Sequence, residues 1–181
     1  MKQPDNSLVQ FLSNKTYTIA IQQHITDLIE ALLHPAEVQV AQLYHEVLDN
    51  WESKLAAAAS KKAYDAYIGY QNILSQRHAN LKHRLFLDGL TFGLAHSFPE
   101  PAALQHALRH SQLEATAALA AQHETHLQQA ASQFFDVAGE SGAGDVVEGL
   151  QTSLLAYFHD IERAAFLFGA EFGGRLTAMD D

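Results

Sequence analysis

Two copies of the octapeptide Phe-Leu-x-Gly-x-x-Phe-Gly lie 80 residues apart, FLDGLTFG at 86–93 and FLFGAEFG at 166–173. Each copy lies near the end of a helical pattern, where a glycine costs roughly 0.8 to 1 kcal/mol relative to alanine. Glycines four residues apart share a helix face and let another backbone approach, while phenylalanines add apolar area beside it. We therefore predict a close helix crossing made by Phe86, Gly89, Phe92, Gly93, Phe166, Gly169, Phe172 and Gly173.

The spacing of the apolar residues predicts an all-α fold, a bundle of about five helices in a single domain over residues 1–181. Apolar residues recur three and four positions apart, and only four prolines and one glycine cluster interrupt them. An N-terminal helix is expected over about 17–33, ended by His34-Pro35 because a residue before proline avoids the α region. Further helices are expected from Pro35 onward, over about 102–138 and over about 145–178.

The repeat itself predicts where one hidden turn lies. The stretch AAAASKKAYDAY at 56–67 contains no helix breaker, yet a single helix over 36–97 would be about 93 Å long, too long for a compact domain of this size. Subtracting 80 from the clear break at 139–144 places a turn around Ser60. The chain would then hold two helical units, about 35–98 and 101–178, related by a pseudo-twofold axis.

The glycine motif also resembles a known pattern. Helices ending in Phe-x-x-Gly-Phe-x-Leu-Gly-x-Arg are typical of a family of short, uncharacterised bacterial all-helical proteins. Gly89 and Gly93 match this ending in the first copy, and Gly169, Gly173 and Arg175 match it in the second. The chain differs in its fused length and in lacking Gly-Phe after the first glycine. The resemblance implies a fused double copy and no activity.

Charge is distributed unevenly along this acidic chain of net charge −10. Residues 1–99 carry eight Lys/Arg and nine Asp/Glu, whereas residues 100–181 carry three and twelve. Nucleic acids and anionic membrane surfaces require clustered basic residues, so both are disfavoured as partners. An acidic surface mainly aids solubility. It could instead bind a basic protein partner, and Glu114, Glu124 and Glu148 are the candidates for that face. The absence of cysteines and of a signal pattern suits a cytoplasmic protein.

Residues that could carry chemistry form no strong pattern, and we expect neither a catalytic residue nor a cofactor. The best metal-binding alternative is His106, His110 and Glu114, spaced four apart, although these also suit a hydrated helix face. No Glu-x-x-His of the kind found in di-iron bundles occurs. The reversed pair, His159 and Glu162, is expected to face water.

Packing motifs therefore outweigh chemical motifs in this sequence. We predict a non-enzymatic helical protein that binds a protein partner or a second copy of itself, in which case it would form a homodimer. The alternative is a metal-binding protein or a cofactor-free enzyme with its site between helices, and the eleven histidines are the feature in its favour.

Overall fold

The structure, a computed structural model, describes residues 15–96 and 99–179, with no side-chain description at 15–21 and 120–124. These ranges contain helices and no strand, so the all-α prediction is confirmed. The chain divides into two compact units, residues 1–34 and residues 35–181. The helices are α2 (Lys15–Ala58), α3 (Lys61–Ala95), α4 (Pro101–Glu140) and α5 (Gly144–Ala178).

Helix α2 does not end where the sequence predicted. It continues through Pro35, so the expected helix end at His34-Pro35 is wrong. A proline inside a helix removes one backbone hydrogen bond and crowds the preceding turn, which weakens a helix without always ending it. The boundary between the two compact units does fall between His34 and Pro35. Within the first unit, Gln23 donates a hydrogen bond to Asp27 one turn later.

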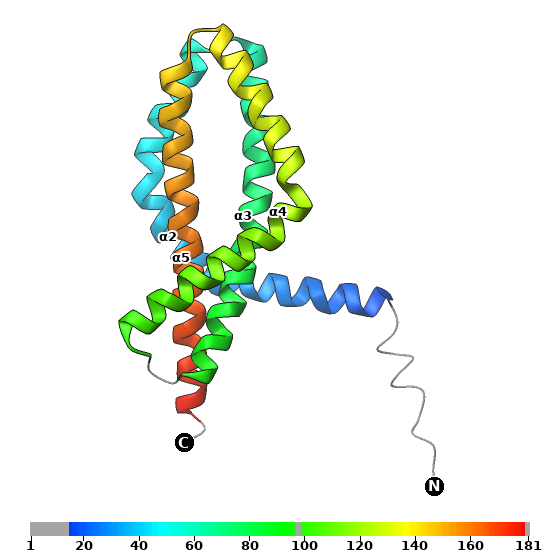
Figure 1. Cartoon of the computed structure of the whole chain (residues 1–181), viewed down its shortest axis with the longest axis vertical. Coiled ribbons are helices and arrows are strands. Elements are labelled where there is room, and N and C mark those ends of the chain that lie inside the picture. Colours follow the sequence, from blue (N-terminus) through cyan, green and yellow to red (C-terminus); the bar gives the residue numbers. More distant parts are fainter. Residues whose placement is uncertain (1–14, 97–98, 180–181) are drawn as a thin grey trace. The chain divides into compact units, whose positions relative to one another are not determined.

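Residues 35–181 form two helical hairpins, α2–α3 and α4–α5. The first helix of each hairpin packs against the second helix of the other. Figure 1 shows α3 and α5 running in the same direction away from the two turns. The later part of α2 contacts α5, where the Tyr44 hydroxyl donates a 2.7 Å hydrogen bond to Asp160. Helix α4 packs mainly on α3 and much less on α5, its own hairpin partner. Helices α3 and α5 therefore form the centre, flanked by α4 and α2.

Both predicted turns are present. Helix α2 ends at Ala58 and α3 begins at Lys61, where the Ser60 hydroxyl caps the helix by accepting from the amide of Ala63 at 3.2 Å. The second turn joins Glu140 to Gly144. There Gly142 takes a φ of 73°, a left-handed conformation that a side chain disfavours.

The core of the larger unit has two clusters of buried side chains. One lies near the turns, where Tyr67 and Tyr70 pack on Phe134 with ring centroids 5.5 and 5.8 Å apart. The other surrounds the predicted crossing and is built on Leu85 and Phe166. Helix α3 contributes to both clusters, so it connects the turn end of the bundle to the crossing.

Burial of Tyr67 makes the fold sensitive to alkali. Desolvation raises the pKa of Tyr67 above its ordinary value of 10.0, and the hydrogen bond that its hydroxyl donates to Glu52 raises this pKa further. The unfolded chain therefore loses this proton near pH 10 while the folded chain keeps it. Stability should be unaffected below pH 10 and fall above it. Tyr67→Phe should flatten that fall, measured by urea unfolding on either side of pH 10. An equal alkaline loss in the variant would contradict the assignment.

Candidate functional site

The two octapeptides lie against each other where α3 crosses α5. A Cβ placed on Gly89 would collide with the carbonyl oxygen of Phe166, and one on Gly169 would collide with the carbonyl oxygen of Phe86. One turn later, Gly93 meets the Ala170 carbonyl and Gly173 meets the Leu90 carbonyl in the same way. At these four glycines the two backbones are in direct contact.

The phenylalanines of the motif pack around this crossing. Phe86 and Phe166 are buried, whereas Phe92 and Phe172 are half-buried. The rings of Phe92 and Phe166 lie 6.2 Å apart, and those of Phe86 and Phe168 lie 6.3 Å apart. Each of these ring pairs joins α3 to α5.

Burial follows the same register in α3 and α5. Adding 80 to a buried position of α3 gives a buried position of α5 along nearly the whole helix. On α3 these positions are Tyr67, Tyr70, Leu74, His78, Leu81, Lys82, Leu85, Phe86, Gly89 and Gly93, and on α5 they are Val147, Leu150, Leu154, Phe158, Ile161, Glu162, Ala165, Phe166, Gly169 and Gly173.

A buried polar pair lies in this register, and sequence analysis missed it. The Nδ1 atom of His78 on α3 contacts the Glu162 carboxylate on α5, and their side chains are only 10% and 8% exposed. With the carboxylate ionised, Nδ1–H is the donor. The imidazole also stacks on Phe158, with ring centroids 4.1 Å apart. Its Nε2 atom is buried and has no hydrogen-bond partner among the described residues.

Glu162 is therefore buried, so the expectation that it faces water is wrong. It lies in the inward stripe of α5 beside Ile161, and the contact with His78 offsets the cost of desolvating its carboxylate. A second buried ion, Lys82 on α3, forms an ion pair with Glu37 on α2. The signal available in the sequence was the register, because His78 and Lys82 both continue the helical spacing of the buried apolar residues.

The residues of the metal-binding alternative and the acidic candidates Glu114 and Glu148 lie on the surface. His106 is exposed, as are His110 and Glu114, whose Nδ1 and carboxylate oxygen are 3.7 Å apart. Among the residues whose side chains are described, no three His, Asp or Glu come close enough together to hold a metal ion.

The acidic candidates do not form one patch. Glu114 lies on α4 and Glu148 on α5, both exposed, and the intervening length of α4 spans about 39 Å at 1.5 Å per residue. The side chain of Glu124 lies outside the described residues. Glu114 and Glu148 therefore lie toward opposite ends of the α4–α5 hairpin.

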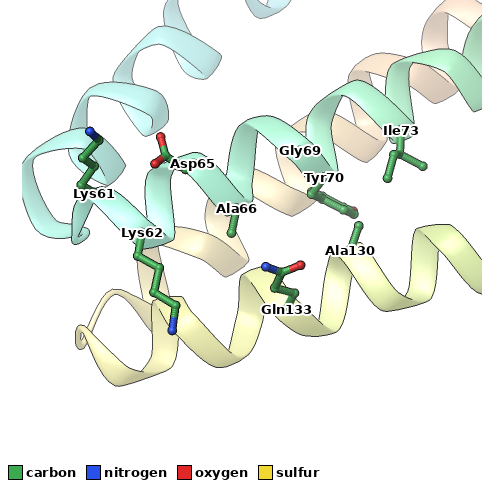
Figure 2. A pocket seen from close by; sticks show the side chains of 9 residues that line it. All are labelled: Lys61, Lys62, Asp65, Ala66, Gly69, Tyr70, Ile73, Ala130 and Gln133. Atoms are coloured by element: carbon green, nitrogen blue, oxygen red, sulfur yellow. The ribbon is translucent and has the colours of Figure 1, made fainter.

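An open groove of about 680 Å³ lies between α3 and α4 near the turn end. Figure 2 shows Lys62, Ala66 and Tyr70 on the side of α3 that faces α4, with Ala130 and Gln133 of α4 opposite them. Gly69 also lines the groove, and nothing lies within 4 Å of a Cβ built on it. The lining of the groove combines apolar and polar side chains.

Comparison of the chain with protein-family models, with curated proteins and with solved structures finds no match. The resemblance to the short bacterial helical family therefore stays a prediction. In the described part of the chain, no helix combines the length and apolar character needed to cross a bilayer.

Proposed function

We propose that this chain is a non-enzymatic helical interaction protein, built from two fused helical units related by a pseudo-twofold axis. The reciprocal contacts at the crossing support the axis. Gly89 meets Phe166 while Gly169 meets Phe86, which is the same contact after exchanging positions 80 residues apart. Such exchange is the signature of a twofold contact. The shared burial register of α3 and α5 supports it independently.

Exposed aliphatic side chains on α2 carry the functional part of the proposal. Leu43 is 75% exposed, and Val47, one turn later on the same face of the helix, is 44% exposed. Isolated surface leucines are common in soluble proteins, but two exposed aliphatic residues one turn apart on one helix face favour a contact surface. The partner is a protein or a second copy of this chain. The crossing of α3 and α5 would hold the outer helices rigid for such binding.

Site-specific photo-crosslinking in the native cell tests this function. A photoreactive residue in place of Leu43 should yield crosslinked adducts, to a second copy of this chain or to another protein, because the α2 surface contacts that partner. Leu155 on α5 is an exposed leucine that serves as the matched control position. Leu43→Glu should also lower the mass measured by light scattering if the partner is a second copy. Equal crosslinking from both positions, or none from either, contradicts the proposal.

The alternative function is a metal-binding protein or a cofactor-free enzyme with its site between helices. The observation in its favour is the buried Nε2 atom of His78, which lacks a partner among the described residues while Nδ1 contacts a carboxylate. Metal-binding histidines are commonly oriented by a carboxylate in this way. Elemental analysis of the untagged protein tests the metal-binding form of this alternative. A stoichiometric metal that is lost in His78→Phe would favour the metal-binding protein, and its absence would contradict it.

A further inference from the structure

We propose that the groove between α3 and α4 is a socket for an aromatic side chain, an indole above all, presented by a protein partner. This inference rests on the proposed function and names the chemistry that the partner would present. The chain itself supplies the comparison, because the equivalent position, between α5 and α2, is already filled by a tryptophan.

The two equivalent positions are Gly69 on α3 and Gly149 on α5, which are 80 residues apart. A Cβ on Gly149 would lie 2.5 Å from Cη2 and Cζ2 of Trp51, so the indole of Trp51 lies directly on this glycine. A Cβ on Gly69 meets nothing within 4 Å. One glycine thus supports an aromatic ring, while its counterpart faces the open groove.

The residue that would fill the groove is missing from α4. Adding 80 to Trp51 gives Ala131, and its neighbour Ala130 lines the groove. Where α2 places an indole on α5, α4 therefore places a methyl group near α3. The α4 position equivalent to Trp51 thus carries no ring, and the space beside Gly69 is open.

The chemistry of the groove suits the same kind of occupant. Tyr70 and Ile73 are apolar or aromatic residues of its lining, and Asp65 and Gln133 are polar ones. In the filled socket, the Lys54 Nζ lies 4.4 Å from the centroid of the Trp51 ring, a cation–π contact. Lys62 of α3 lies at the groove and brings a cation there from a different position, because the residue equivalent to Lys54 is Phe134 (Figure 2). An indole would thus find apolar side chains and a cation in both places.

Nuclear magnetic resonance of the full-length, nitrogen-15-labelled chain tests the socket directly. Titration with N-acetyl-tryptophanamide should give saturable shifts confined to the amides around Gly69 and Gln133. N-acetyl-leucinamide should bind at least about tenfold more weakly, because it buries less apolar area in the groove. Localised shifts with this preference support the socket. Absent shifts, or equal shifts with the leucine probe, overturn it.

Filling the groove from within the chain should abolish binding of the probe. Ala130→Trp places an indole in the groove from α4, one position before the equivalent of Trp51, and Gly69→Leu provides an independent, smaller filling. Ala156→Trp, on an exposed position of α5, is the matched control and should leave binding unchanged. Undiminished binding in both filled variants overturns the assignment. The crosslinking result at position 43 bears on the proposed function alone, so the two failures are distinguishable.

Discussion

Replacing Gly89 with alanine is expected to lower the free energy of unfolding by on the order of 3 kcal/mol, with a similar loss for Gly169→Ala. The added methyl would collide with the carbonyl oxygen of Phe166 in one case and of Phe86 in the other. Main-chain atoms cannot rotate aside as a side chain can, so relief requires α3 and α5 to separate. Separation would also loosen the buried rings around the crossing. Urea unfolding monitored by circular dichroism measures the loss.

Gly69→Ala is the matched control, because Gly69 lies in the interior of the same helix with open space around its Cα. Alanine there should raise the free energy of unfolding by up to about 1 kcal/mol through helix propensity alone. Opposite signs at positions 69 and 89 would isolate the effect of the crossing. A rise in stability at Gly89 and Gly169 would mean that the close backbone approach is wrong.

The sequence predicted much of the fold because two local signals happened to be strong. Helical spacing identified the helices, and the offset of 80 placed a turn at Ser60 where no breaker residue is visible. The same signals did not predict the course of α2 through Pro35. A proline weakens a helix by a fixed local amount, and the rest of the helix decides whether that cost is tolerated.

The polar interior was harder to predict for a different reason. A histidine or a glutamate at a core position is predicted to be a surface residue as long as its partner is unknown. Glu162 is buried against His78, which is 84 positions away in sequence and on another helix. Spacing along one helix contains no information about that partner. By contrast, the acidic candidates Glu114 and Glu148 are exposed, but the length of α4 keeps them apart.

The contact between His78 and Glu162 should be costly to break from one side. Glu162→Leu leaves the imidazole buried with neither nitrogen paired among the described residues. Removing one partner of a buried polar pair leaves the other buried without a partner, so its full desolvation cost lowers the stability of the fold. The expected loss is on the order of 3 kcal/mol. Glu171→Leu is the control on the same helix, because Glu171 is exposed and forms an ion pair with Arg175 at the surface, so its effect should stay below about 1 kcal/mol.

Replacing both partners together should restore most of that stability. His78→Phe places a phenyl ring against Phe158, where the imidazole already stacks in parallel, and Glu162→Leu then faces an apolar neighbour. Apolar replacement of a whole buried pair is often neutral or stabilising, because no desolvated polar group remains. The double variant should therefore be clearly more stable than Glu162→Leu alone, giving a coupling energy of about 1 to 3 kcal/mol in a double-mutant cycle of urea unfolding. Simple addition of the two single losses would show that the pair is not coupled and that each residue is held by other contacts.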